Sequence, residues 1–526
     1  MQKQNYNMRT ERKSSIKNSA TRLILIALLV LIQTGWMIVL MSKLNTYSTA
    51  ITLIMTCIAV IIALKVFGTH VNSAQRMPWL IVITAVPFFG ICIYLLFGRS
   101  IVTKGMRRRF NGIEADILKN KLKQDEQIIK ELEQKDPGIA NQCRYISNTA
   151  KYPVYKNTDM EYYNTALESF EAQLWELSKA EKFIFMEYHA IEDAISFERL
   201  KKVLIDKAKN GVEVRIFYDD LGSIFFLNKE FIKLMRDEGI QCRVFNPLKV
   251  IVNMFMNNRD HRKITVIDGK VGFTGGYNLA DEYFNITHPY GYWKDTGVKL
   301  TGDAVKSLTA SFLTMWNAID HTDSQEAYDE YIDATDGAYN AASQECYVQP
   351  YSDNPLGHDR IGEDVYLNIL KNAKHYVYIT TPYLIITDEM ERELRLAVKR
   401  GVDVRIVTPG IPDKKMVYKI TRSYYEPLCS AGVRIYEYTP GFCHAKQWVA
   451  DDEVCVVGTI NMDFRSLYLH FENAVFTYNR ELAGKVKADM LNNFEISNEV
   501  TSDYAVDVIR PLKLGTCMLH MISPLL

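Results

Sequence analysis

Two stretches of this sequence repeat one arrangement of residues: DHRKITVIDGKVGFTGGYN, Asp260 to Asn278, and CHAKQWVADDEVCVVGTIN, Cys443 to Asn461. Each contains a His-x-Lys, then an Asp, a Gly and an Asn at matching intervals. The recurring identities are His261/His444, Lys263/Lys446, Asp268/Asp451, Gly275/Gly458 and Asn278/Asn461. Packing explains a repeated Gly well but a repeated Lys poorly, because Lys is almost never fully buried unless it is paired. The repeat therefore predicts a functional site that is built twice.

The segments before each motif are duplicated as well. KAEKFIFMEYH (Lys179–His189) parallels NAKHYVYITTPY (Asn372–Tyr383), and GVEVRIFYDD (Gly211–Asp220) parallels GVDVRIVTPG (Gly401–Gly410). Helical patterns alternate with apolar, β-branched runs, which predicts an α/β fold. We expect two tandem domains, residues 151–335 and 336–526, each a mixed β-sheet flanked by helices, packed face to face.

Each motif predicts a β-hairpin with its turn at Asp-Gly or Asp-Asp-Glu. His and Lys are then expected on one strand, two residues apart, so that both side chains share a face. Asp268 and Asp451 belong to the motif as catalytic candidates. Because they stand at the hairpin turn, we favour a backbone-binding role for them over a direct chemical one.

The repeated residue types point to phosphate chemistry. Two imidazoles and two ammonium groups around one pocket suit an anion, and the lysines would neutralise its charge without a metal or other cofactor. One imidazole can attack phosphorus while the other protonates the leaving alkoxide. A carboxylate that accepts an imidazole N–H would orient the ring, and Asp295 and Glu472 are the candidates.

The front of the chain differs from the rest in charge. Residues 1–113 hold fourteen Lys and Arg and one acid, which leaves 48 basic and 61 acidic residues for the remainder. Basic residues beside apolar runs indicate an anionic membrane surface rather than nucleic acid. Nine cysteines without a CxxC pair indicate no zinc framework and favour reducing surroundings.

Three apolar runs carry no charged residue: 23–41, 50–64 and 77–98. They predict a membrane anchor of two or three transmembrane helices over residues 23–98, after a basic tail at 1–22. The first run resembles a signal peptide, but it lacks an A-x-A site and two more runs follow, which favours a retained anchor. We expect a multi-pass protein of the cell membrane with its catalytic part on the cytoplasmic face.

A basic and amphipathic connector, residues 99–150, is expected between the anchor and the catalytic domains. Within it, residues 114–135 predict one helix with Leu118, Leu122, Ile129 and Leu132 on one side. A solvated connector is favoured over a helix that lies on a membrane or pairs with a partner.

The two motifs match the HxKxxxxD…GxxN pattern of the phospholipase D superfamily. The stretches RMPWLIVITAVPFFGICIYLLFGR (76–99), TGGYNLADEY (274–283), YWKDTGVKLTG (292–302) and GTINMDFRSLYLHFE (458–472) resemble the bacterial cardiolipin synthases. The resemblance implies that two phosphatidylglycerol molecules give cardiolipin and glycerol through a phosphatidyl-histidine, with no metal or nucleotide. It implies His261 as nucleophile and His444 as acid and base.

The resemblance also implies supporting residues near the phosphate. Asn278, Asn461 and Thr459 are expected there, and Thr459 stands where relatives have a Ser, with Gly276 as its counterpart in the first copy. Two positions depart from the family pattern, which usually has His in place of Gly297 and Asn in place of His470.

Other functions remain possible on this pattern. A membrane phospholipase D, or another phosphatidyltransferase, would use the same residues. A non-catalytic scaffold or a nucleic-acid-binding protein is disfavoured because both His-Lys pairs are intact, and the acidic balance after residue 113 disfavours a nuclease. The expected partners are phosphatidylglycerol and the lipid bilayer, without nucleic acid.

Overall fold

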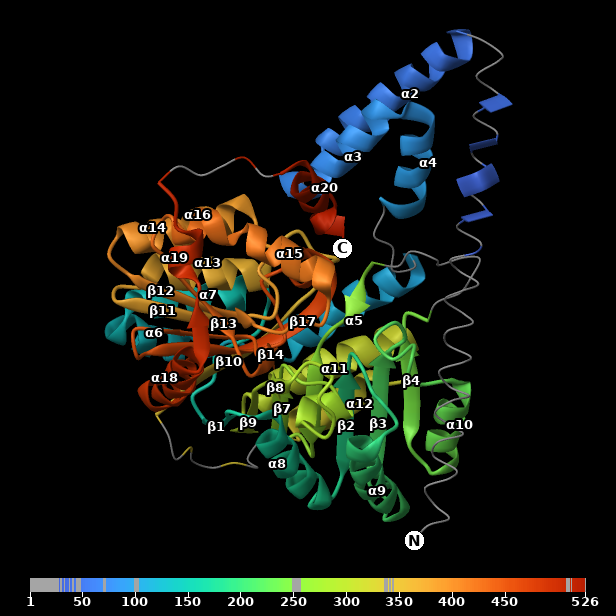
Figure 1. Ribbon diagram of the computed structural model, residues 1–526. Helices are drawn as coiled ribbons and strands as arrows, with labels where there is room; N and C mark the ends of the chain where they lie inside the picture. Colours follow the sequence, from blue (N-terminus) through green and yellow to red (C-terminus); the bar gives the residue numbers. More distant parts are fainter. Residues whose placement is uncertain are drawn as a thin grey trace.

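The computed structural model describes residues 49–69, 72–98, 104–247, 257–334 and 345–507 continuously, together with scattered positions from 28 to 43, residues 339, 342 and 511, and residues 513–525. Two sheet domains lie side by side, and helices α2 to α4 project from one end of the pair (Figure 1). The predicted basic tail at 1–22 lies outside the described residues, as does most of the apolar run 23–41.

The first domain is a seven-stranded mixed sheet in the order β1-β9-β7-β6-β2-β3-β4. Its strands β2, β3 and β4 are parallel, whereas β6, β7, β9 and β1 are joined by antiparallel pairs. The strands are β1 (Thr158–Tyr163), β2 (Phe183–Tyr188), β3 (Glu213–Asp219), β4 (Gln241–Phe245), β6 (Lys263–Ile267), β7 (Val271–Gly275) and β9 (Gly297–Gly302). The helices are α8 (Ala166–Ser178), α9 (Ile195–Lys209), α10 (Lys229–Asp237), α11 (Val305–Ile319) and α12 (Gln325–Asp333).

The second domain repeats this topology in the order β10-β17-β16-β15-β11-β12-β13, and β18 extends its edge. The strands are β10 (Tyr347–Asp353), β11 (Tyr376–Thr380), β12 (Asp403–Pro409), β13 (Arg434–Tyr438), β15 (Gln447–Ala450), β16 (Val454–Gly458), β17 (His470–Tyr478) and β18 (Ser497–Glu499). The helices are α13 (Ile361–Asn372), α14 (Asp388–Lys399), α15 (Lys415–Ser423), α16 (Tyr425–Cys429), α17 (Phe464–Tyr468), α18 (Arg480–Glu495), α19 (Thr501–Tyr504) and α20 (Leu514–Ile522). The expected duplication and both expected hairpins, β6–β7 and β15–β16, are therefore present.

The two domains exchange short strands beside the motifs. β5 (Arg259–Asp260) pairs with β17 of the second domain, and β14 (Gly441–Cys443) pairs with β8 (Tyr292–Lys294) of the first. The expectation that His and Lys share one strand is wrong in detail. β6 begins at Lys263 and β15 only at Gln447, because the chain before each hairpin turns away to pair with the other domain.

The apolar runs 50–64 and 77–98 form three helices, α2 (Thr49–Phe67), α3 (Ser73–Ala85) and α4 (Pro87–Phe97). The run 77–98 is not one helix, contrary to the expectation. Pro87 cannot donate an N–H and disfavours helical backbone at Val86, so α4 starts anew there. It packs so closely on α3 that a Cβ on Gly90 would lie 2.3 Å from the Val82 carbonyl oxygen. Among the helices described, none is long and apolar enough to cross a membrane.

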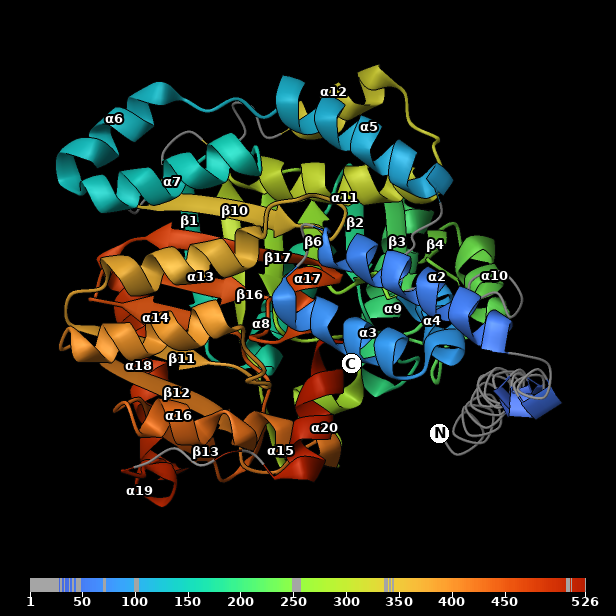
Figure 2. The same ribbon diagram turned by 90° about the horizontal axis from the view of Figure 1, so that it is seen from above.

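The connector also differs from its prediction. Two helices, α5 (Lys104–Asn120) and α6 (Glu126–Lys135), replace the single helix, because residues 122–125 are not helical and Asp125 caps α6. Leu118, Leu122, Ile129 and Leu132 are all buried in the core that the two domains share. Seen from above, α5, α6 and α7 (Pro137–Thr149) lie along one side of both domains (Figure 2), so the connector binds the domains together instead of standing in solvent.

Candidate active site

The two motif histidines lie where the domains exchange strands. The His261 N–H donates to the Phe471 carbonyl at 2.9 Å, and the His444 N–H donates to the Lys294 carbonyl at 2.7 Å. Phe471 belongs to the second domain and Lys294 to the first, so each histidine is held by backbone of the opposite half. The exchange therefore fixes both imidazoles at the interface between the domains.

Each imidazole is paired with a carboxylate of the opposite domain. His261 Nδ1 lies 2.9 Å from both carboxylate oxygens of Glu472, and His444 Nδ1 lies 2.6 Å from Asp295 Oδ2. Both acids are fully buried. A carboxylate accepts, so each Nδ1 carries the proton, and each Nε2 keeps its lone pair for attack on an electrophile or for taking a proton.

The two lysines lie directly beside the histidines. Lys263 Nζ donates to the His261 carbonyl at 2.5 Å, and Lys446 Nζ donates to the His444 carbonyl and lies 2.7 Å from its Nδ1. Burial lowers the pKa of Lys263 to about 7 and that of Lys446 to about 8. These ammonium groups are thus placed to bind an anion and to lose their charge near neutrality.

The motif groups of both halves act on one another electrostatically. Burial lowers the pKa of His261 well below its ordinary value, and the charges of Lys263, Lys446 and His444 lower it further. Burial lowers the pKa of His444 to about 3, with a further contribution from Lys446. Both imidazoles are therefore neutral without a bound anion, and the two half-sites form one site.

The predicted phosphate-binding residues contact protein groups. The Asn278 amide accepts from the Ala190 N–H at 3.2 Å and donates to the Tyr283 hydroxyl at 2.8 Å. The Asn461 amide donates to Asp463 Oδ2 at 2.9 Å. The Thr459 hydroxyl donates to Glu472. These contacts stiffen the loops and orient the acid that holds His261.

Asp268 and Asp451 lie at the hairpin turns, each with positive φ. Asp268 accepts three backbone N–H bonds, from residues 181 to 183, at 2.7 to 2.9 Å. Asp451 accepts the corresponding three, from residues 374 to 376, at 2.6 to 2.9 Å. The turn is at the far end of the motif strand from the histidine, so each acid ties its hairpin to the start of the adjacent antiparallel strand, β2 or β11.

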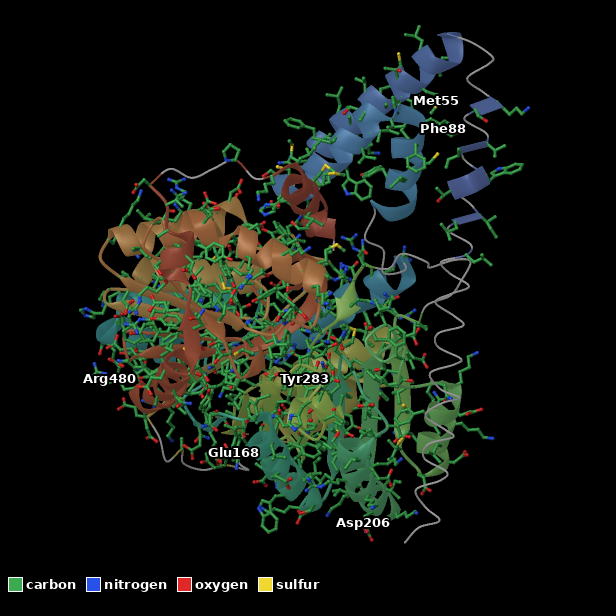
Figure 3. The ribbon with its side chains drawn as sticks, viewed as in Figure 1. Met55, Phe88, Glu168, Asp206, Tyr283 and Arg480 are labelled. Carbon is green, nitrogen blue, oxygen red and sulfur yellow. The ribbon has the colours of Figure 1, made fainter. Side chains whose placement is uncertain are left out.

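The surroundings of the two histidines differ, which the duplicated motif did not reveal. The His261 ring has two other imidazoles as neighbours, His189 at 5.0 Å and His470 at 5.4 Å between centroids. The His444 ring instead has aromatic neighbours. Their centroid distances are 5.3 Å for Tyr283, 5.3 Å for Trp293 and 5.7 Å for Phe442. Tyr283 lies where the two domains meet (Figure 3).

Sequence reasoning had only weak signals for these neighbours. His189 directly follows a buried strand, where polar side chains reach a pocket, and His470 stands out only as a departure from the family pattern. The other departure, Gly297, has a steric cause. A Cβ there would lie 2.4 Å from Ser169 Oγ and 2.9 Å from the Tyr277 ring, so the position has no room for His.

The comparisons with known proteins agree with this geometry. The sequence profile "Cardiolipin synthase, PLD-like domain" matches residues 174–316 and 366–493, and the profile "Phospholipase_D-nuclease N-terminal" matches residues 54–99. The structure of phosphatidylserine synthase from Haemophilus influenzae aligns with a TM-score of 0.53, at 14% identity, over 69% of this chain and 93% of its own. Fold and site therefore define a phospholipase D-like protein with two tandem domains.

Sequence relatives narrow the class. A cardiolipin synthase from Clostridium perfringens is 32% identical over 460 residues, which cover 86% of this chain and 95% of the relative. A cardiolipin synthase from Geobacillus is 32% identical over 482 residues, which cover 90% of this chain and 94% of the relative. An uncharacterised protein from Streptococcus mutans is 39% identical over 465 residues, which cover 88% of this chain and 99% of the relative. The chain belongs to the cardiolipin synthase family of phospholipase D-like enzymes.

We predict that Gly276→Ala lowers kcat. A Cβ at this position would lie 2.1 Å from Asp295 Oδ1, so the methyl group must displace the carboxylate that holds His444. A displacement of about 1 Å in a catalytic group costs on the order of 100-fold in rate. Gly484→Ala is the matched control, because its Cβ would meet nothing within 4 Å. Turnover of phosphatidylglycerol and thermal unfolding check both variants, and a kcat within twofold of the unmodified protein for Gly276→Ala contradicts the prediction.

We predict that kcat/KM falls as the pH rises from 7 to 9. The charged form of a lysine exists below its pKa, and burial brings the pKa of Lys263 to about 7 and that of Lys446 to about 8. The free enzyme therefore loses its anion-binding charges over this range. A bound phosphodiester favours the charged lysines, so the alkaline limb of kcat should lie at higher pH than that of kcat/KM. Two alkaline limbs that coincide, or a kcat/KM that is level up to pH 10, would be inconsistent with this electrostatic role.

Proposed function

We propose that this protein joins two phosphatidylglycerol molecules into cardiolipin and releases glycerol, through a phosphatidyl group carried on His261. The observation that carries the proposal is the pair of imidazole–carboxylate contacts across the domain interface, with an ammonium group beside each. Family membership supports the same reaction, because the curated relatives that cover most of this chain carry the name cardiolipin synthase.

The first half of the reaction forms the covalent intermediate. His261 Nε2 attacks phosphorus while Lys263 and Lys446 neutralise the phosphodiester. The P–O bond to glycerol breaks, and His444 donates a proton to the leaving oxygen. His444 is neutral without a bound anion, so it must take up this proton when the anion binds, and an anion beside it favours that uptake.

The second half of the reaction transfers the phosphatidyl group. The neutral His444 takes the proton of a glycerol hydroxyl on a second phosphatidylglycerol, and that oxygen attacks phosphorus. The bond from phosphorus to His261 Nε2 breaks, and both histidines return to their initial states. Atoms and protons balance over the two steps without a metal or nucleotide.

The aromatic rings around His444 support its role as the acid. Tyr283 and Trp293 lie at 5.3 Å from its ring, within the range at which an aromatic face stabilises a cation. His261 has imidazole neighbours instead, and burial keeps it neutral, as a nucleophile requires.

The apolar N-terminal segment, residues 23–98, is proposed to hold the catalytic domains at the cytoplasmic face of the membrane. Helix α2 supports this, because Leu53, Ile61, Leu64 and Phe67 are each 64 to 66% exposed. Water competes with the second lipid for the intermediate. Confinement to a bilayer raises the effective concentration of the lipid hydroxyl, which favours transfer over hydrolysis.

We predict that the full-length protein in detergent converts phosphatidylglycerol alone into cardiolipin and free glycerol. Phosphatidylglycerol labelled in its terminal glycerol makes both products measurable. Release of phosphatidic acid without cardiolipin would instead indicate a phospholipase D. His261→Ala and His444→Ala should each lower turnover by on the order of 10⁴-fold or more, because removing one of two cooperating catalytic groups costs about as much rate as removing both. The control is His288→Ala, since His288 is exposed.

We predict that His261→Ala and His444→Ala behave differently on a substrate whose leaving group needs no proton, which distinguishes the nucleophile from the acid. With a phosphatidyl ester of nitrophenol, His444→Ala should release one nitrophenolate per enzyme and then stop, because no base activates the second alcohol. His261→Ala should release none. Label in the phosphate should map to His261 after an alkaline quench, which preserves a phosphohistidine. A single burst in His261→Ala, with label on His444, would reverse the assignment.

A further inference from the structure

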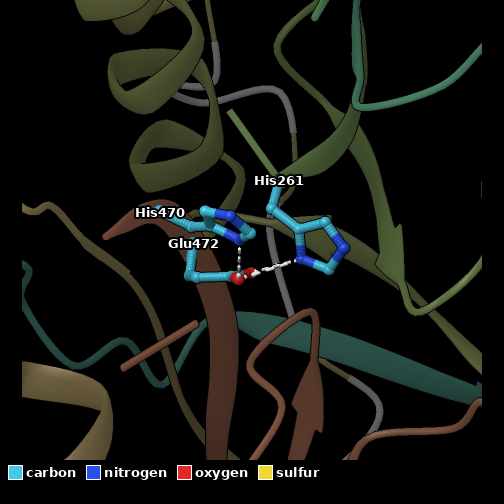
Figure 4. Close-up of side chains that lie close together, drawn as sticks. All are labelled: His261, His470 and Glu472. Atoms are coloured by element: carbon cyan, nitrogen blue, oxygen red, sulfur yellow. Dashed lines mark hydrogen bonds and ion pairs between the residues drawn. The ribbon is translucent and has the colours of Figure 1, made fainter. Parts of the chain in front are cut away.

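A third imidazole reaches the carboxylate that orients the proposed nucleophile. His470 opens β17 and stands two residues before Glu472, so both side chains lie on one face of the strand. Its Nδ1 lies 3.6 Å from Glu472 Oε1, whereas His261 Nδ1 lies 2.9 Å from the same oxygen (Figure 4). Two imidazoles from different domains thus approach one carboxylate.

Arg465 fixes which nitrogen of His470 carries a proton. The Arg465 Nε–H donates to His470 Nε2 at 3.1 Å, so Nε2 must be the acceptor and Nδ1 the N–H. That Nδ1 is buried, and no hydrogen-bond partner lies within bonding distance of it among the residues described. A buried donor without a partner costs free energy, so its direction toward Glu472 requires an explanation.

A metal ion is the competing explanation. The ligand atoms of His261, His470 and Glu472 lie within 4.8 Å of one another, close enough to surround one cation. A metal on His470 Nδ1 would need the lone pair there, while Arg465 already uses the lone pair on Nε2. A neutral imidazole has only one lone pair in its ring plane, so the arginine opposes metal binding.

We infer that His470 is a positioning residue, which directs its Nδ1–H at Glu472 and so holds this carboxylate against His261. This inference rests on the proposed covalent role of His261. When His261 is bonded to phosphorus its ring is a cation, and a fixed carboxylate beside Nδ1 stabilises that cation. Shortening of the 3.6 Å contact to an ordinary hydrogen bond would accompany this step.

The charge state of His470 suits this role. Burial lowers its pKa well below the ordinary value, although Glu472 acts in the opposite direction. A neutral His470 donates a hydrogen bond without placing a second positive charge beside His261. A lysine or arginine there would donate as well, but its charge would oppose the cationic intermediate.

Two variants of similar size test the proposal. In His470→Asn the side-chain amide places an N–H at the position of the ring Nδ1, so the donor toward Glu472 is preserved. In His470→Leu this donor is absent. The readout is the rate of the first nitrophenolate burst from the phosphatidyl ester of nitrophenol, with thermal unfolding as the check on folding. This readout reports on His261 even if the final product proves to be phosphatidic acid.

We expect His470→Leu to slow the burst by between about 10-fold and 100-fold with little change in KM, and His470→Asn to retain most of the rate. The other groups that face or act on Glu472 are unchanged in both variants: His261, Thr459, Lys263, Lys446, Tyr366 and Asp463.

Three results would overturn the inference. One is an unchanged burst rate in His470→Leu. Another is equal loss in both variants, which would show that the shape of His matters and not its donor. The third concerns zinc at micromolar concentration. If zinc inhibits the unmodified protein but not His470→Leu, and the burst rate of His470→Leu is unaffected, His470 is a metal ligand.

Discussion

The structure depends on two buried imidazole–carboxylate pairs that cross the domain interface. Glu472 and Asp295 are fully buried, and each meets a histidine that the other domain supplies. An ionised carboxylate buried without a partner costs several kcal/mol, about what is lost when one member of a buried pair is removed. Each acid also accepts a hydrogen bond within its own domain, from the Thr459 hydroxyl or the Thr296 N–H, but the motif imidazole comes from the other domain. The domains must therefore associate for the site to form. Selection for activity and selection for stability would both preserve the two imidazole–carboxylate pairs.

The strand exchange gives this constraint its geometry. A histidine on the regular strand would lie in its own sheet, at a place set by the register of the hairpin. Here β5 and β14 leave their own sheets and pair with β17 and β8, so the backbone of the opposite domain positions each imidazole. The shared core beneath the interface and the helices α5 to α7 along its side restrict relative motion of the domains. Two distant segments of the chain thus contribute side chains to one interface.

The sequence predicts the parts of this fold that depend on local pattern. The duplicated hairpins follow from alternating strands around a turn, and the repeated Gly275 and Gly458 end their second strands, β7 and β16. Other features depend on contacts between distant residues. No periodicity around His261 indicates that its backbone will bind Phe471, and none indicates that the connector will be buried in a core shared by both domains. The break at Pro87 could have been foreseen, since proline inside an apolar run interrupts a helix. The domain boundaries and the chemical roles of the site residues stay predictions.

Duplication also explains why the two half-sites can differ. Two identical half-sites would both favour the same protonation state, yet the reaction needs one neutral nucleophile and one proton donor. Position 276 is Gly, which leaves space for Asp295, whereas the matching position 459 is Thr, whose hydroxyl binds Glu472. Imidazoles surround one histidine, and aromatic rings surround the other. The repeat supplies the shared scaffold of His, Lys and backbone-binding Asp. Substitutions around it separate the environments of the two imidazoles, as the proposed division into a nucleophile and an acid requires.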